Sequence, residues 1–251
     1  MEEKINLIAQ KIKASKRLIV FTGAGISTES GIPDYRSQGG LWTKFQPIYF
    51  DEFMSSKDAR IRYWDHHLHM GKSLMTSKPN IGHDSIASLH KHGFLKTVIT
   101  QNIDGLHQKS GIPEKDVIEL HGNATRVRCM SCRQLFTWEA AKEMIAQGNT
   151  PPECQCSGYL KPDTISFGQS MPVEETRKAA ELSSQSDVFI VVGSTLIVQP
   201  AALMPRYAKD NGAFLVIINL SDTPYDSVCD VLIREKAGSV LEQIVQKVLH
   251  T

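Results

Sequence analysis

The sequence lacks the features of a membrane protein or a nucleic-acid-binding protein. Its 251 residues contain no apolar run long enough to cross a bilayer. With 28 lysines and arginines against 27 aspartates and glutamates, the formal charge of +1 gives no net attraction to nucleic acid or anionic lipid. The amino-terminal stretch has two glutamates and no secretory apolar core. We therefore expect a cytoplasmic protein without direct nucleic-acid or membrane partners; composition does not indicate its oligomeric state.

Cysteine is scarce, and four of the five cysteines form two close pairs. Cys129 and Cys132 form a CxxC pair, and Cys154 and Cys156 form a CxC pair. In a reducing compartment, paired thiolates more often bind a metal than form disulfides. We predict a structural zinc site with these four ligands; a redox pair or two unrelated pairs of thiols are the alternatives. Cys229 lies in an apolar stretch and is expected to pack inside.

The sequence also lacks the full dinucleotide fingerprint of a dehydrogenase. An apolar run at 17–22 leads directly into Gly23, Ala24 and Gly25. Glycines there allow the backbone to approach a phosphate, and a following helix supplies N–H groups. The third glycine position of the fingerprint is Thr28, and no strand about 20 residues further on ends in an acidic residue. This pattern predicts a dinucleotide site without hydride transfer.

Short apolar runs rich in β-branched residues recur along the chain, at 17–22, 95–100, 117–120, 187–192 and 213–218. Strands that are apolar on both faces are typical of a parallel sheet between two helix layers. We predict an α/β fold with a doubly wound, Rossmann-like parallel sheet formed by residues 1–125 and 161–251. Residues 126–160, which hold the four paired cysteines, are predicted to be an inserted zinc-binding module.

Residues 36–75 are expected to form a cofactor-binding loop and a helical segment. Eight of the eighteen aromatic residues lie between Tyr35 and Trp64, and Pro47 and two glycines interrupt regular structure there. This density of rings suits a mobile cover that closes over a ligand. The alternative is a small helical unit that packs its own core, and the segment could combine this unit with a mobile cover.

Polar residues follow three further predicted strands. They are Gln101, Asn102, Asp104 and His107 after 95–100, His121 after 117–120, and Ser194 and Thr195 after 187–192. The carboxyl ends of parallel strands share one edge, where open α/β sheets bind ligands. An imidazole with an ordinary pKa of about 6.5 can act there as a base. One such residue alone would more often be a helix cap or a satisfied core group, but four polar strand ends predict a site.

In order and approximate spacing, these motifs resemble those of the sirtuins, a family of NAD-consuming protein deacylases. The resemblance covers nearly the whole chain and rests on GAGIS, GIPDYR, TQNIDGLH, the HG pair at 121–122, the four cysteines, FGQ at 167–169, GSTLIVQPA and INLSDTPYD. The chain departs from the usual family pattern in four places. Tyr35 stands where phenylalanine is usual, Gln169 stands where glutamate is usual, GST at 193–195 replaces the commoner GTS or GSS, and the second cysteine pair is CxC.

The resemblance implies that NAD is a cosubstrate and that zinc is structural. Once nicotinamide leaves, the carbonyl oxygen of an acyl-lysine attacks the ribose carbon, and a base deprotonates a ribose hydroxyl. Water completes transfer of the acyl group to ADP-ribose, which frees the lysine. The implied protein partners are acyl-lysine proteins or peptides.

The resemblance also implies a role for each site residue. The catalytic residues would be His121 as the base, and Asn102. The nicotinamide pocket would be lined by Ala24, Ile32, Asn102 and Asp104, and Arg36 would lie near the diphosphate. The full set implied to bind NAD is Gly23, Ala24, Gly25, Ile32, Tyr35, Arg36, Gln101, Asn102, Ile103, Asp104, Gly193, Ser194, Thr195 and Asn219. The acyl-lysine tunnel would be bordered by Phe167, Gly168 and Val198.

Two other functions fit parts of the sequence. A mono-ADP-ribosyltransferase would use the same motifs and transfer ADP-ribose to a protein side chain. A non-catalytic zinc-ribbon module that senses NAD would not require His121, Asn102 and Asp104, whose presence argues against it.

The acyl preference depends on the helical segment. Sirtuins that remove succinyl or malonyl groups carry Tyr-x-x-Arg, whereas the position three after Tyr63 is His66. A buried carboxylate without a charged partner is costly, so we expect acidic acyl groups to be poor substrates. The runs RIRYW and KPNIGH resemble the class II branch of the family, which implies weak activity on acetyl-lysine and tolerance of longer acyl chains.

Overall fold

A six-stranded parallel sheet forms the centre of the computed structural model, which describes residues 1–35, 40 and 46–250. Its strand order is β3-β2-β1-β7-β8-β9. The strands are β1 (Leu18–Thr22), β2 (Leu95–Thr100), β3 (Val117–Glu119), β7 (Val188–Val192), β8 (Phe214–Ile218) and β9 (Val231–Ile233). The five strands predicted from apolar runs are confirmed, and the doubly wound order reverses between β1 and β7. The short strand β9 was not predicted.

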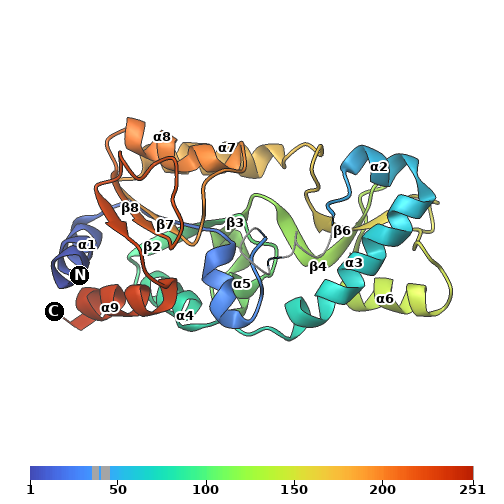
Figure 1. Cartoon of the computed structure of the whole chain (residues 1–251), viewed down its shortest axis with the longest axis horizontal. Helices are drawn as coiled ribbons and strands as arrows, with labels where there is room; N and C mark the ends of the chain where they lie inside the picture. Colours follow the sequence, from blue (N-terminus) through green and yellow to red (C-terminus); the bar gives the residue numbers. More distant parts are fainter. Residues whose placement is uncertain (36–39, 41–45, 251) are drawn as a thin grey trace.

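Alternate residues of each strand face opposite helix layers, as the period of two in a strand requires. Val20, Val98 and Ile190 pack into one core, and their neighbours Phe21 and Ile99 pack into the other. Figure 1 shows the two layers on opposite faces of the sheet. The first layer is α1 (Glu2–Ala14), α4 (Ile81–Lys91) and α9 (Ala237–His250), and the second is α7 (Val173–Gln185) and α8 (Met204–Asp210).

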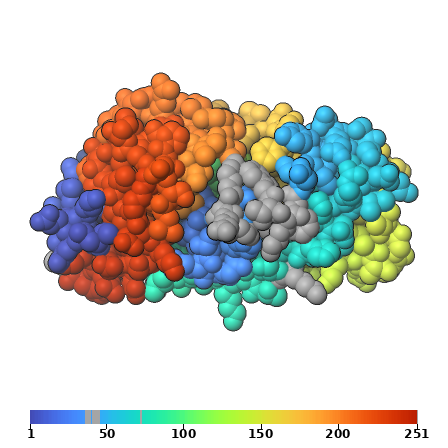
Figure 2. Space-filling model, viewed as in Figure 1, coloured from blue at the N-terminus to red at the C-terminus, as the bar shows by residue number. Residues whose placement is uncertain are grey.

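The cysteine segment belongs to a second, antiparallel sheet with strand order β5-β4-β6. Its elements are β4 (Gly122–Cys129), β5 (Leu135–Thr137), α6 (Trp138–Ala146) and β6 (Leu160–Thr164). Helices α2 (Phe50–Ser55) and α3 (Lys57–Thr76) lie at the same end of the molecule (Figures 1 and 2). The Trp64 indole of α3 stacks on Trp138 at 5.9 Å between ring centroids and donates to the Leu160 carbonyl at 2.9 Å.

Several of the clustered aromatic residues pack inside. Phe53, Tyr63 and Trp64 are buried, whereas Tyr49 is exposed. Phe53 and Tyr63 pack with Ala59 of the same segment, as in the alternative of a helical unit with its own core, whereas Trp64 packs against the cysteine segment. Within the part of the chain that is described, no helix is both long enough and apolar enough to cross a membrane.

Candidate active site

The glycine turn after β1 lies against the turn after β7. Gly25 N–H donates to the Gly193 carbonyl at 2.8 Å, and a Cβ on Gly25 would lie 2.7 Å from the Gly193 Cα. A Cβ on Gly23 would lie 2.7 Å from the Gly193 oxygen. Glycine is therefore required at this crossing because two protein backbones approach each other closely. The sequence had suggested only that these glycines allow approach to a phosphate. The expected helix is the 3-10 helix η1 (Ala24–Ser30).

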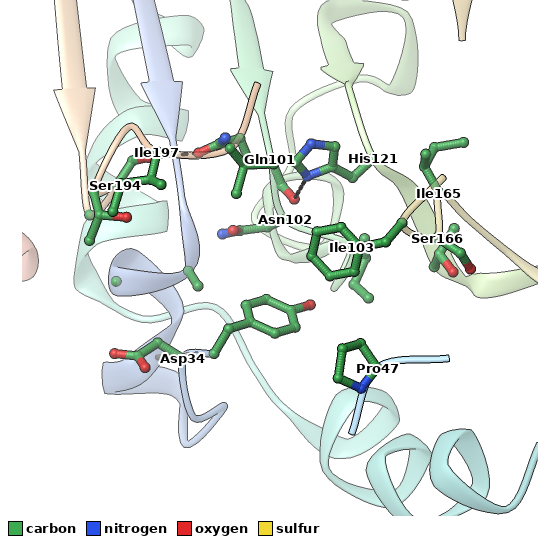
Figure 3. Close-up of a pocket in the computed structure, with 18 of the residues that line it drawn as sticks. Asp34, Pro47, Gln101, Asn102, Ile103, His121, Ile165, Ser166, Ser194 and Ile197 are labelled. Atoms are coloured by element: carbon green, nitrogen blue, oxygen red, sulfur yellow. Dashed lines mark hydrogen bonds between the residues drawn. The ribbon is translucent and has the colours of Figure 1, made fainter. Parts of the chain in front are cut away.

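Two adjoining cavities open at this edge of the sheet. The larger has a volume of about 630 Å³ and the smaller about 350 Å³. The two spaces meet at the residues that line both cavities, which are Ala24, Tyr35, Met70, Asn102 and Ile103. Figure 3 shows side chains from several strand ends converging on the larger one.

The smaller cavity holds the four residues assigned to nicotinamide: Ala24, Ile32, Asn102 and Asp104. The buried Asp104 carboxylate accepts hydrogen bonds from the Ser27 hydroxyl at 2.7 Å and the Leu106 N–H at 2.9 Å. Asn102 donates from its amide nitrogen to the Gly23 carbonyl at 3.1 Å and to the Ser27 hydroxyl at 3.2 Å. Each carboxylate oxygen of Asp104 keeps a further lone pair that can accept from a ligand N–H group.

His121 lines the larger cavity with one ring nitrogen already bonded. Its Nδ1 lies 3.0 Å from the Gln101 carbonyl oxygen (Figure 3). Because a carbonyl only accepts, Nδ1 carries the proton in the neutral ring and Nε2 keeps its lone pair. Burial lowers the pKa of His121, and the bond to Gln101 opposes that effect only in part. The imidazole is therefore neutral at neutral pH, as a general base must be.

The Gln101 side chain bridges two strand ends. Its Oε1 accepts from the Ser194 hydroxyl at 2.7 Å, and the same hydroxyl accepts from the Leu196 N–H at 3.2 Å. Ser194, which the resemblance implies to bind NAD, thus has protein partners on both sides of its oxygen. Its contacts fix the orientation of Gln101.

Most of the remaining predicted residues border the larger cavity. They are Gly25, Phe167, Gly168, Gly193, Thr195, Val198 and Asn219. Gly23 lines neither cavity, and Arg36 falls outside the described residues.

His107 was expected at the crevice, but it is buried inside the protein and lines neither cavity. Its Nε2 lies 2.8 Å from the Thr22 hydroxyl, and its ring is 5.1 Å from that of His83. Burial lowers the pKa of His107 to about 3. After the turn at 101–105 the His107 ring packs against Thr22 at the end of β1, so His107 is a core residue.

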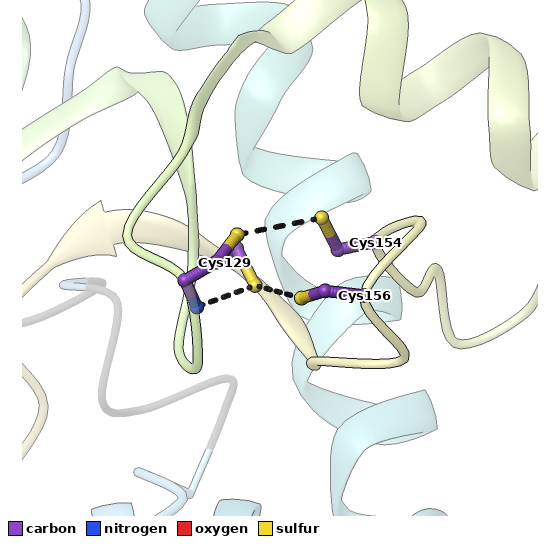
Figure 4. Close-up of side chains that lie close together, drawn as sticks. Cys129, Cys154 and Cys156 are labelled. Carbon is purple, nitrogen blue, oxygen red and sulfur yellow. Dashed lines mark hydrogen bonds between the residues drawn. The ribbon is translucent and has the colours of Figure 1, made fainter.

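The four paired cysteines meet at one point, although the chain between the pairs is more than twenty residues long (Figure 4). All four sulfur atoms lie within 4.8 Å of one another. The Sγ atoms of Cys129 and Cys156 are 3.5 Å apart, and those of Cys132 and Cys154 are 3.7 Å apart. Tetrahedral zinc with bonds of about 2.3 Å requires separations of about 3.8 Å. The cluster therefore fits a closed, structural zinc site, while Cys229 packs against the sheet core.

The sequence analysis missed one partner in the site and assigned no contact to a second. Ser27 links Asp104 to Asn102, and its only signal was a polar residue inside the GAGIS turn. Gln169, a departure from the usual family pattern, accepts from the Ser166 N–H through Oε1 at 3.2 Å. An amide oxygen can fill this acceptor position without a carboxylate.

Comparisons with known proteins agree with this geometry. The sequence model of the Sir2 family matches residues 23–200. The chain is 45% identical over 242 residues to an NAD-dependent protein deacetylase of Rhodopseudomonas palustris, which covers 96% of each chain. It is 40% identical to NAD-dependent protein deacylase 2 of Archaeoglobus fulgidus, over 99% of this chain and 97% of the relative. A solved complex of Sir2 with a p53 peptide and NAD+ superposes with a TM-score of 0.86 at 32% identity, over 95% of each chain.

Proposed function

Because the chain belongs to the Sir2 family, we propose that it removes acyl groups from lysine side chains of proteins and consumes one NAD in each turnover. The observation that carries this proposal is the junction of the two cavities. The smaller cavity has the Asp104 carboxylate, which can accept from an amide, and the larger cavity has the His121 imidazole with a free Nε2. A substrate that spans both would place the bond to be broken at the residues that the cavities share.

In this proposal, Asp104 accepts a hydrogen bond from the carboxamide of nicotinamide, and Ile32 and Leu74 contact the ring. The acyl-lysine enters the larger cavity between Phe167 and Val198. Its carbonyl oxygen forms a bond to the ribose carbon as the bond to nicotinamide breaks. His121 then accepts the proton of a ribose hydroxyl at Nε2, and that hydroxyl attacks the former carbonyl carbon. Gln101 and Asn102 orient the ribose.

The larger cavity also supports a proposal about the acyl group. The Tyr63 hydroxyl lies 3.2 Å from the Thr164 hydroxyl and 3.3 Å from that of Ser166, and His66 and His67 line the same wall. No arginine lines this cavity among the residues that the structure describes. Beside Tyr63 a negatively charged acyl group would lose hydration without a guanidinium to pair with among the described residues, so neutral acyl groups are the proposed substrates; the cation that lines this cavity is Lys236.

Three further parts of the proposal come from the sequence. They are the cytoplasmic location, the division into residues 1–125 with 161–251 and a module at 126–160, and the class II assignment. ADP-ribosyl transfer to protein is not favoured, because the full-length relatives are named deacetylases and deacylases.

Mass spectrometry with NAD and one peptide carrying acetyl, longer aliphatic or succinyl groups on lysine tests the function. We expect the peptide to lose the mass of its acyl group and O-acyl-ADP-ribose to form. A peptide that gains the mass of ADP-ribose would overturn deacylation, and a preference for succinyl would overturn the acyl argument. Efficient removal of acetyl alone would exclude only the class II assignment.

A further inference from the structure

The turn that carries His121 is closed by a hydrogen bond between the residues on either side of it. Glu119, at the end of β3, accepts through Oε1 from the Asn123 amide at 2.6 Å. Between them, Gly122 has a φ of 74°, and a Cβ there would lie 2.0 Å from the Asp163 carbonyl oxygen. The chain therefore reverses tightly against β6, and the Glu119–Asn123 contact spans the base of this reversal. We call this contact the histidine bracket.

Glu119 accepts hydrogen bonds from three side chains. Besides Asn123, its carboxylate accepts from Gln108 of α5 (Leu106–Lys109) at 2.7 Å and from Arg126 of β4 at 2.7 Å. The Glu119 side chain is 11% exposed. Arg126 has two further carboxylate partners, Asp163 at 3.4 Å and Glu114 at 2.8 Å, and the Glu114 side chain is 76% exposed. Two glutamates thus bind one guanidinium, and only the buried one reaches across the His121 turn.

The backbone on both sides of the bracket is also fixed. Leu120 N–H donates to the Thr100 carbonyl at 3.0 Å, and Ile165 N–H donates to the His121 carbonyl at 2.9 Å. The residue after Thr100 is Gln101, whose carbonyl accepts from the His121 ring. A shift of the bracket would therefore move the His121 imidazole relative to the Gln101 carbonyl, which sets its tautomer.

We propose that Glu119 is a positioning residue for His121. It lines neither cavity and acts through the bracket, which holds the imidazole with Nδ1 on Gln101 and Nε2 toward the larger cavity. This inference rests on the proposed deacylation and on the role of His121 as its base.

The test compares Glu119→Gln with Glu114→Gln. The second variant is the matched control, because it removes the carboxylate of the exposed partner of Arg126. The amide in Glu119→Gln keeps one acceptor oxygen, so the three donors can no longer all be satisfied. We expect kcat for deacylation to fall by about tenfold to a hundredfold, as small misplacement of a catalytic group produces. KM for NAD and the rate of nicotinamide exchange should remain at wild-type values, because breaking the nicotinamide bond precedes the step that uses His121. Glu114→Gln should match wild type in kcat for deacylation, in KM for NAD and in the rate of nicotinamide exchange.

The Asn123→Ala variant breaks the other end of the bracket and tests the inference independently if Glu119→Gln fails to fold. It should show the same loss of deacylation with exchange retained, and the double variant should be no slower than the slower single variant. Wild-type deacylation in Glu119→Gln, or an equal fall of exchange and deacylation, would overturn the inference. A wild-type protein that leaves every acyl-lysine peptide unchanged would instead overturn the proposed function.

Discussion

The hydrogen bond from His121 to Gln101 determines which ring nitrogen can act as a base. With Nδ1 occupied, only Nε2 is available, so His121→Ala removes the proton acceptor and leaves both cavities otherwise intact. We expect deacylation to fall by roughly a hundredfold or more, with NAD affinity and melting temperature close to wild type. His92→Ala, at an exposed histidine, is the control. Near-normal turnover of the His121 variant would contradict the assigned role.

The ionisation of His121 also sets a direction for the pH dependence of catalysis. Burial lowers its pKa below the ordinary value of 6.5, so the imidazole is half protonated only at a pH below that value. Deacylation should therefore decline on acidification with a midpoint below about pH 6.5. The pH profile of kcat/KM measures this midpoint, and a midpoint above about 6.5 would contradict the expectation.

Asp104 should act earlier in the reaction than His121. Its carboxylate is held by Ser27 and Leu106, and Asp104→Ala removes the acceptor proposed for the nicotinamide carboxamide. Loss of one hydrogen bond to a charged group typically costs about 1.5–3 kcal/mol, so nicotinamide exchange and deacylation should both fall by roughly ten- to a hundredfold. Exchange of labelled nicotinamide into NAD measures the first step alone. Unchanged exchange with slow deacylation would exclude this role for Asp104.

At the scale of elements, the zinc module depends on contacts between its two cysteine pairs. Metal binding supplies folding energy where the ligands come from distant parts of the chain. We expect Cys129→Ala to lose zinc, to lower the melting temperature and to expose the module to proteolysis, whereas Cys229→Ala keeps about one zinc per chain. Metal analysis and limited proteolysis of the two variants provide the comparison. A folded, active Cys129→Ala protein without metal would refute the structural role.

The elements that were predicted correctly are those whose signal is local. Strands such as β7 are continuously apolar because helices cover both faces, and the period of the pattern is visible within five residues. Strand β5 is exposed at both ends and forms no run that distinguishes it from a loop, whereas β9 is as short as the predicted β3 and wholly apolar, so its residues did carry a signal that the prediction passed over. The strand-end rule placed Asn102 and His121 at one edge without any structural information.

The contacts inside the site could not be predicted in the same way. The bond from Ser194 to Gln101 and the crossing of Gly25 with Gly193 join segments more than ninety residues apart. Both depend on the parallel register of β1 with β2 and β7, which a local pattern does not encode. His107 shows the converse: it follows a strand end, but the turn directs its ring into the core.

At the scale of the whole molecule, buried neutral imidazoles make stability sensitive to acid. His67 is stacked on the Tyr63 ring at 4.2 Å, and its Nδ1 lies 2.9 Å from the Tyr63 carbonyl. Burial is the largest cause that lowers its pKa to about 4; the bond to Tyr63 opposes this, while the nearby Lys161 and His66 add to it. Protonation of His67 is therefore unfavourable in the folded chain and ordinary in the unfolded chain.

The sign of the effect follows from proton binding by the two states. Above about pH 6.5 neither state protonates this group, and below it the unfolded chain binds the proton while the folded chain does not until the pH nears 4. The free energy of unfolding should thus fall by about 1.4 kcal/mol for each pH unit in this window because of His67 alone. His67→Phe keeps an aromatic ring against Tyr63 and should remove that part of the slope. The matched change His92→Phe, at an exposed position, should leave the slope as in wild type. Urea unfolding of the three proteins between neutral pH and about pH 5 measures the slopes, and equal slopes for His67→Phe and wild type would show that this imidazole does not couple folding to pH.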